Sequence, residues 1–321
     1  DGLDGAEDSI QGGFRNLDRL LGTSSGDTLR GIDSPAVWNI DSPTSMYQSL
    51  GKSLSFAGIE NLYGGADTDS FILADGVPLG GLIDGGAGQD GLDYSLWTTA
   101  MAFTLAAVDV SNGYGGSATG VTSGFTGIDW LTGGAALDSL AALDLASEWF
   151  INAANHIYRT SRDLGFSAIE SITAGSEADS FHFVAGVALA AASTINAGAG
   201  IDTLDYSAWV TSVVVDLVSG AATAVKNALA GGVAGFENLI GGSGDDDLRG
   251  DAGHNLITGG AGADYLVGRS GNDTYLFEDG WGADSVVENP DEGSDTLDFS
   301  AVTLDLSFTL NSDLAVSDGS N

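Results

Sequence analysis

The chain has no cysteine, only 4 proline residues, and only 9 lysine and arginine residues among its 321 positions. Without cysteine it can form neither disulfide bonds nor thiolate metal sites. Its three histidines, His156, His182 and His254, do not have metal-ligand spacing to one another. No apolar run approaches the ~20 residues of a membrane-spanning helix, so we expect no membrane insertion.

Most of the charged residues are acidic. Asp and Glu number 45, which gives a net charge of −36 at neutral pH. Such a field repels nucleic acids and anionic membranes and attracts cations. The apolar fraction of 43% argues against disorder once this charge is neutralised. We therefore expect a folded chain whose partners include cations and exclude nucleic acid.

Glycine is abundant, with 49 residues, and it is most regularly placed in residues 241–276. This stretch reads as four blocks of nine: GGSGDDDLR, GDAGHNLIT, GGAGADYLV and GRSGNDTYL. Glycines at positions one, two and four permit a turn and a close backbone approach. An acid or amide follows at position six, and the apolar residue at position eight has the spacing of a short strand with one buried side chain. Two blocks would make one coil of a flattened solenoid.

In such a solenoid, turns eighteen residues apart lie over one another. Asp246 would then lie over Asp264, and Asn255 over Asp273, and the carboxylates would repel one another unless a cation lay between them. Carboxylate and carbonyl oxygens suit Ca²⁺. The expected ligands are the side chains of Asp246, Asn255, Asp264 and Asp273, and the turn glycines Gly242, Gly244, Gly260, Gly262 and Gly271 through their carbonyl oxygens.

Two further turns, GGAGQD ending at Asp90 and AGAGID ending at Asp202, have the same pattern without a neighbouring nonapeptide. They are additional Ca²⁺ candidates if another coil's turn lies against them. More degraded turns end at Asp27, Asp69, Asp138 and Asp179. There we expect a turn-capping aspartate that accepts a hydrogen bond from a backbone N–H.

The four blocks resemble the RTX nonapeptide repeat, G-G-x-G-x-D-x-U-x, whose tandem copies form a Ca²⁺-loaded parallel β-roll. Residues 241–249 and 259–267 match at every defined position. Residues 250–258 depart at Asp251 and Asn255, and residues 268–276 depart at Arg269. The resemblance implies Ca²⁺ as the cofactor. The residues that follow resemble the looser coils that often close such arrays, which implies that Asp284 and Asp295 are further Ca²⁺ ligands.

Residues 14–110 and 125–222 are two copies of one long unit. FAGIENLYGGADTDSFIL (56–73), for example, matches FSAIESITAGSEADSFHF (166–183). The Ala- and Leu-rich residues 135–153 have helical propensity, but their counterpart in the first copy contains Gly and Pro, so we expect solenoid coil in both. The inward-pointing apolar residues are predicted to be Leu29, Phe71, Leu92, Leu140, Phe181 and Leu204.

The sequence thus predicts an all-β parallel solenoid, with a wide irregular β-helix over about residues 1–235 that narrows into a regular β-roll. The expected segments are 1–124 and 125–234, which are irregular solenoid units, 235–300, which is the β-roll, and 301–321, which are terminal strands. Since residue 1 falls inside a repeat-like phrase, we expect a piece of a longer protein. Its exposed strand edges would allow copies or neighbouring repeats to stack end to end.

Two recurring aromatic features have structural explanations. The phrases Asp93-Tyr94-Ser95, Asp205-Tyr206-Ser207 and Asp298-Phe299-Ser300 recur in every unit, which favours a coil-closing turn over an acid–nucleophile pair. Trp38, Trp97, Trp149 and Trp209 recur in pairs, which favours core residues over a sugar-binding platform.

The long units also resemble repeats of very large secreted or surface-anchored bacterial proteins. This resemblance implies an extracellular structural or adhesive role, secreted or at the cell surface, without enzymatic activity. One alternative is a self-assembling filament or surface-layer subunit. Another is a polysaccharide lyase or epimerase with a β-helix fold, but such an enzyme needs clustered lysine and arginine residues, and the 9 present are scattered.

Overall fold

The computed structural model describes residues 3–5, 14–24, 26–153, 155–189, 193–225, 232–290, 292–309 and 315–317. Within these residues all regular structure is β-strand, and no α-helix occurs. Residues 135–153 accordingly hold strands, as predicted. The described residues also contain no helix that could cross a membrane. The all-β fold class is confirmed.

Packing divides the chain into two compact units. Unit 1 comprises residues 1–144 and 154–174, and unit 2 comprises residues 145–153 and 175–321. The four segments expected from the sequence repeats follow a different criterion, and their boundaries stay a prediction.

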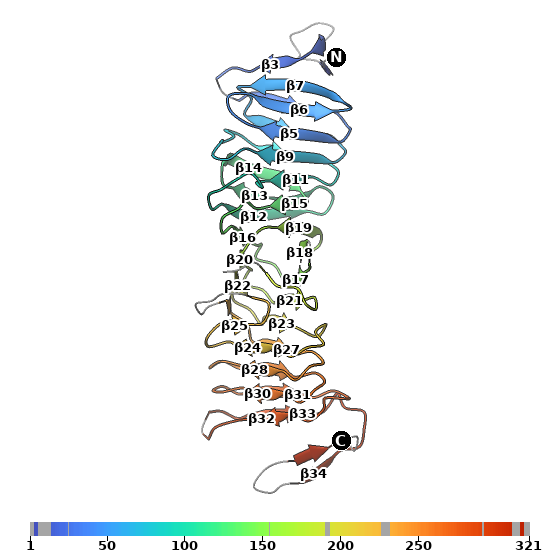
Figure 1. Ribbon diagram of the computed structural model, residues 1–321, viewed down its shortest axis with the longest axis vertical. Coiled ribbons are helices and arrows are strands. Elements are labelled where there is room, and N and C mark those ends of the chain that lie inside the picture. Colours follow the sequence, from blue (N-terminus) through green and yellow to red (C-terminus); the bar gives the residue numbers. More distant parts are fainter. Residues whose placement is uncertain are drawn as a thin grey trace. The chain divides into compact units, whose positions relative to one another are not determined.

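Unit 1 is a parallel solenoid whose chain alternates between two sheets (Figure 1). One sheet pairs β4 (Thr28–Arg30), β8 (Asn61–Tyr63), β10 (Ile83–Asp84) and β14 (Val121–Ile128) in parallel. The other pairs β5 (Ala36–Ile40), β9 (Asp69–Leu73), β11 (Gly91–Asp93), β15 (Trp130–Thr132) and β19 (Asp163–Ser167) in parallel. Each coil therefore contributes one strand to each sheet.

Antiparallel insertions make these coils unequal. β5 continues into β6 (Ser45–Ser49) and β7 (Lys52–Ala57), and β14 is preceded by β12 (Ala102–Asp109) and β13 (Gly113–Ala118). β18 (His156–Arg159) pairs antiparallel with β19. The remaining strands of the unit are β1 (Leu3–Gly5), β2 (Phe14–Leu17), β3 (Arg19–Leu21), β16 (Ser139–Ala141) and β20 (Ser171–Thr173).

Unit 2 has the same plan with shorter strands (Figure 1). One parallel sheet contains β17 (Ser147–Ile151), β21 (Asp179–Phe183), β23 (Thr203–Asp205), β27 (Asn238–Ile240), β29 (Leu256–Thr258), β31 (Thr274–Leu276) and β33 (Thr296–Asp298). A second contains β24 (Val214–Asp216), β28 (Asp247–Arg249), β30 (Tyr265–Val267) and β32 (Ser285–Val286) in parallel, with β25 (Ala221–Ala222) antiparallel to β24. Two further pairs are β22 (Thr194–Asn196) with β26 (Val233–Ala234), and β34 (Ser307–Thr309) with β35 (Ala315–Ser317).

Strand register confirms the coil length of the β-roll. Asn238 pairs with Leu256, and Leu256 with Thr274, so these coils are eighteen residues long. The next coil is longer, because Thr274 pairs with Thr296. A regular parallel β-roll therefore occupies the part of the chain where the nonapeptides predicted it.

The core is one file of apolar side chains along the inside of each unit. Leu248, Ile257, Leu266 and Tyr275, the four position-eight residues, are all fully buried. The predicted inward residues Phe71, Leu92, Leu140, Phe181 and Leu204 are buried as well. Leu29 is an exception, since it is only half-buried. Its strand β4 is the end strand of its sheet in the described residues, so no further coil covers it.

The predicted aromatic roles are also confirmed. Trp38, Trp97, Trp149 and Trp209 are buried. Trp38 stacks on Phe71 with ring centroids 5.4 Å apart, and Trp149 stacks on Phe181 at 5.2 Å, which is the same contact in the two copies of the long unit. In the three recurring corners, the Oδ1 atom of the aspartate accepts a hydrogen bond from the serine N–H two residues later, at Asp93, Asp205 and Asp298.

Candidate metal centre

The position-six side chains are buried in the turns. Asp246 is 2% exposed, Asp264 and Asp273 are 1% exposed, and Asn255 is 3% exposed. These side chains are therefore shielded from solvent and do not form a solvated acidic edge. Burying a carboxylate is costly unless hydrogen bonds or a counter-charge compensate it.

Hydrogen bonds link these side chains into two columns. Asp246 N–H donates to Asp264 Oδ1 at 2.8 Å, and Asp264 N–H donates to Asp284 Oδ1 at 3.0 Å. In the second column, Asn255 N–H donates to Asp273 Oδ1 at 2.8 Å, and Asp273 N–H donates to Asp295 Oδ1 at 3.0 Å. The structure therefore brings together the side chains that the repeat spacing predicted, and it adds Asp284 and Asp295, which the resemblance predicted, at offsets of 20 and 22 residues.

The first turn of each column is closed by its own side chain. Asp246 Oδ2 accepts the N–H of Gly242 at 2.6 Å, and Asn255 Oδ1 accepts the N–H of Asp251 at 3.0 Å. We call such a turn, in which the position-six side chain accepts the position-two N–H, a closed turn. Both side-chain oxygens of Asp246 are consequently used, because its Oδ1 accepts the N–H of Val213.

The second turn of each column has a different backbone. Gly260 and Gly262 have φ values of +94° and +134°, and Gly271 has +132°. We call these open turns, because the position-six side chain leaves one oxygen free. In the described part of the chain, the buried carboxylate oxygens with no hydrogen-bond partner are Oδ2 of Asp90, Asp202, Asp264 and Asp273, and Oε2 of Glu288.

Electrostatics point to the same atoms. Burial, together with the neighbouring Asp284 and Asp246, raises the pKa of Asp264 to about 7. Burial likewise raises the pKa of Asp284 to about 6 and that of Asp273 above its ordinary value. Because the columns resist ionisation on their own, a cation beside the free oxygens would favour the ionised carboxylates. Free, hard oxygen donors without sulfur or imidazole fit Ca²⁺.

Close packing of the turn glycines brings carbonyl oxygens of the closed turns against the open turns. A Cβ added at Gly260 would clash with the carbonyl oxygen of Gly242, and one added at Gly262 would clash with that of Gly244. Gly271 lies against the carbonyl oxygen of Gly253 in the same way. Only glycine permits this approach, which packs the carbonyl oxygens of Gly242, Gly244 and Gly253 against the next open turn.

Glu288 joins this site although the nonapeptide pattern did not predict it. Carboxylate oxygens of Asp273, Glu288 and Asp295 lie within 4.8 Å of one another. Glu288 is positioned by Tyr275, whose hydroxyl donates to Glu288 Oε1 and accepts the N–H of Gly268 at 2.5 Å. The available signal was Tyr275 itself, because a phenol at the buried position eight needs a polar partner.

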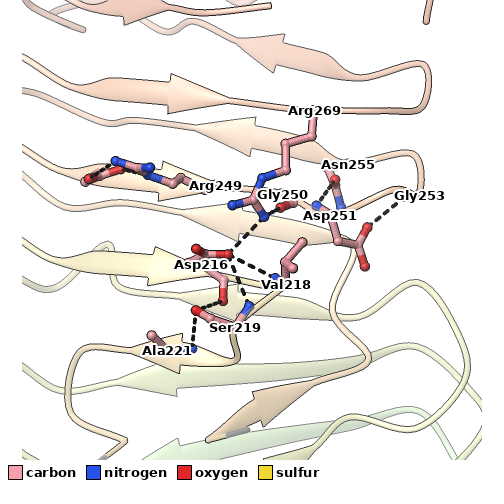
Figure 2. A network of polar contacts seen from close by, with 11 residues as sticks. Asp216, Val218, Ser219, Ala221, Arg249, Gly250, Asp251, Gly253, Asn255 and Arg269 are labelled. Atoms are coloured by element: carbon pink, nitrogen blue, oxygen red, sulfur yellow. Dashed lines mark hydrogen bonds and ion pairs between the residues drawn. The ribbon is translucent and has the colours of Figure 1, made fainter. Parts of the chain in front are cut away.

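Arg269, the residue in place of the second glycine, supplies a fixed positive charge. Figure 2 shows its guanidinium between Asp216 and Gly250; it donates to Asp216 Oδ1 at 2.9 Å and to the Gly250 carbonyl oxygen at 2.5 Å. The Arg269 hydrogen bond holds the pKa of Asp216 below its ordinary value. The neighbouring turn 250–255 has Asn255 in place of an acid. The guanidinium of Arg269 thus lies beside this turn as a fixed positive charge.

The remaining candidate turns separate into the same two classes. Asp27, Asp69, Asp138 and Asp179 each accept the backbone N–H four residues earlier, at Thr23, Gly65, Gly134 and Gly175. They are turn caps, as predicted. Asp90 and Asp202 are fully buried and do not cap their own turns, and each has the free Oδ2 noted above.

Part of the chain matches a known family of repeats. Residues 240–275 match the model of the RTX calcium-binding nonapeptide repeat in four copies. No curated protein matches the chain.

Proposed function

Because residues 240–275 are four RTX calcium-binding nonapeptide repeats and form a parallel β-roll, we propose that this chain is an extracellular structural or adhesive segment that Ca²⁺ binding folds. RTX repeats bind Ca²⁺ and are typically structural rather than enzymatic. Proteins that contain them are generally secreted, which supports an extracellular location.

The observation that carries the proposal is the free Oδ2 atom of Asp264 and of Asp273 inside the matched repeats. A Ca²⁺ ion beside each atom would give a buried carboxylate the partner that the protein does not supply. The proposed ligands of the first column are the side chains of Asp264 and Asp284 and the carbonyl oxygens of Gly242, Gly244, Gly260 and Gly262. Asp246 would join them through the second lone pair of an oxygen that already accepts an N–H. Those of the second column are Asn255, Asp273, Asp295 and Glu288 with the carbonyl oxygen of Gly271.

Charge explains how binding would control folding. A chain with net charge −36 repels itself, and the buried columns add carboxylates that are costly to ionise. At low Ca²⁺ concentration we expect a loose chain, which suits export through a narrow channel. At the higher concentration outside the cell, the ions join consecutive turns, and their binding free energy becomes folding free energy.

Circular dichroism and thermal unfolding of the whole chain test this proposal. We expect the β-sheet signal and the melting temperature to rise when Ca²⁺ replaces EGTA. Sodium chloride at equal ionic strength controls for screening, and Mg²⁺, which demands an octahedral shell, should stabilise less. A β-sheet signal and melting temperature that are the same in chelator and in Ca²⁺ would refute the proposal.

A further inference from the structure

Two pairs of turns outside the matched repeats have the contacts of the pairs within them. Asp69 N–H donates to Asp90 Oδ1 at 2.8 Å in unit 1, and Asp179 N–H donates to Asp202 Oδ1 at 2.7 Å in unit 2. The corresponding distance from Asp246 to Asp264 is 2.8 Å. Each pair is a closed turn followed by an open one, although the spacing is 21 or 23 residues instead of 18.

The backbone of the open turns is the same as well. Glycines at positions two and four have φ values of +90° and +131° at Gly86 and Gly88, and of +101° and +147° at Gly198 and Gly200. In the β-roll, Gly260 and Gly262 have +94° and +134°.

The contacts between the paired turns also correspond. The position-three N–H donates to the position-two carbonyl of the closed turn, from Ala87 to Gly65 and from Ala199 to Gly175, both at 3.2 Å. Ala261 donates to Gly242 in the same way at 3.0 Å. A Cβ at Gly88 or Gly200 would crowd the carbonyl oxygen of Asp67 or Glu177, just as one at Gly262 would crowd that of Gly244.

Each of these pairs leaves one buried oxygen without a partner. Asp90 and Asp202 are fully buried, and the Oδ2 atom of each accepts no hydrogen bond. The next acid in the Asp90 column, Asp129, is compensated, because Arg162 Nε donates to its Oδ1 at 2.7 Å. Asp90 receives only the single N–H of Asp69. Backbone carbonyl oxygens packed against the open turn and a free carboxylate oxygen within that turn therefore recur at both places.

We propose that Asp90 and Asp202 each bind one Ca²⁺ ion through Oδ2, beside the open turns 85–90 and 197–202. The donors are oxygen atoms alone, which Ca²⁺ accepts in irregular arrangements. The Asp202 site has less space for an ion than the Asp90 site. In unit 1 a Cβ at Gly85 would lie 2.8 Å from Asp90 Oδ2, and Ala197 carries that methyl group at the equivalent position in unit 2. We therefore expect Asp202 to bind Ca²⁺ more weakly than Asp90.

This inference shares its cation with the proposed function but uses different residues, so the two can be tested apart. Bound calcium per chain is measured by equilibrium dialysis and elemental analysis on four forms of the full chain. These are the unchanged chain, Asp90→Asn/Asp202→Asn, Asp264→Asn/Asp273→Asn, and the control Asp75→Asn/Glu148→Gln, which removes two charges from exposed positions.

We expect Asp90→Asn/Asp202→Asn to lose two ions per chain while the control loses none. Asp264→Asn/Asp273→Asn should lose its own ions and keep those two. If Asp90→Asn/Asp202→Asn binds as many ions as the control, the inference is overturned while the proposed function stands. If the unchanged chain binds no calcium, both fail.

A second measurement does not depend on how the variants fold. In crystals of the unchanged chain grown with Ca²⁺, anomalous scattering should show a calcium peak about 2.3–2.6 Å from Oδ2 of Asp90 and of Asp202. Density maps that show calcium in the β-roll and none at these two oxygens would overturn the inference.

Discussion

Asp246 and Asp264 are joined by a hydrogen bond of 2.8 Å from the backbone N–H of the first to Oδ1 of the second. An asparagine at position 264 could accept the same bond through its own Oδ1, but it would carry no charge. A substitution by asparagine at position 264 can therefore distinguish the structural role of this side chain from its role as a Ca²⁺ ligand.

We expect Asp264→Asn to have opposite effects with and without Ca²⁺. In EGTA the variant should be at least as stable as the unchanged chain, because a buried charge is removed. In Ca²⁺ at a hundredfold excess over the dissociation constant, losing one ion should cost about 2.7 kcal/mol. Urea unfolding under both conditions measures this difference, and an equal loss of stability in EGTA and in Ca²⁺ would show a structural role only.

Glu288→Gln tests the acidic cluster at the end of the second column. Glutamine keeps an acceptor for the Tyr275 hydroxyl but withdraws one charge from the cluster with Asp273 and Asp295. We expect Ca²⁺ binding to weaken about tenfold or more. Isothermal titration calorimetry with Ca²⁺ measures the change in affinity. Glu278→Gln, at an exposed side chain, is the matched control, and equal affinities for the two variants would contradict the assignment.

Gly262→Ala and Gly280→Ala separate backbone strain from steric contact. Both glycines have positive φ, +134° and +84°, but an added Cβ meets the carbonyl oxygen of Gly244 at the first site and open space at the second. Gly280→Ala should therefore cost about 1–2 kcal/mol, from its left-handed backbone alone. Gly262→Ala should cost more and should also weaken Ca²⁺ binding. Thermal unfolding that finds equal costs would contradict the close packing of the turns.

His182 and Asp205 predict a pH dependence away from the columns. His182 Nδ1 lies 2.7 Å from Asp205 Oδ2, and this hydrogen bond raises the pKa of His182 above 6.5. Burial raises the pKa of Asp205, but hydrogen bonds from His182 and Ser207 outweigh it, so that its pKa is lowered. Stability from the raised His182 pKa is present below pH 6.5 and is lost as pH rises through that pKa. Stability from Asp205 is present above its ordinary pKa of 3.8 and is lost as pH falls through the lowered one.

The variant Asp205→Asn should accordingly lose most stability between about pH 4 and 6.5 and little at pH 8. NMR titration should show a lower pKa for His182 in the variant. His156 provides an internal reference, since burial lowers its pKa to about 4 and Asp205 is not among the causes. An unchanged His182 titration would mean that the ion pair does not form in solution.

The fold of the β-roll could be predicted from the sequence because each repeat determines its own local structure. Each nonapeptide encodes its own turn and one inward residue, and a constant period fixes the partner of every turn. The pairing of Leu256 with Thr274 could therefore be stated in advance. Leu29 pairs in register with the fully buried Leu62 and so faces inward as predicted, but it stays half-exposed. Its burial depends on a neighbouring coil, which no motif within its own turn encodes.

The site was only partly predictable for a related reason. The acids of the columns follow from spacing, but the distinction between closed and open turns depends on backbone angles that identical motifs do not reveal. GGSGDD closes on Gly242, whereas GGAGAD leaves Asp264 Oδ2 free. Asp90 and Asp202 lie 21 and 23 residues after their partners Asp69 and Asp179, so no fixed period could identify these pairs. Glu288 lies in a longer coil outside the nonapeptides, so their pattern does not include it.

The hydrogen bonds of the columns all point the same way along the chain. Donors belong to the earlier coil and carboxylate acceptors to the later one, from Asp69 to Asp90 and from Asp273 to Asp295. Each turn therefore depends on the coil that follows it, and the solenoid has a polarity. Removing coils from the N-terminal side takes away donors that the remaining carboxylates can replace with water. Removing them from the C-terminal side takes from each end turn the carboxylate that fixes its backbone N–H, and water is then its only acceptor. We therefore expect truncation from the C-terminal side to loosen the last remaining turn more than truncation from the N-terminal side loosens the first.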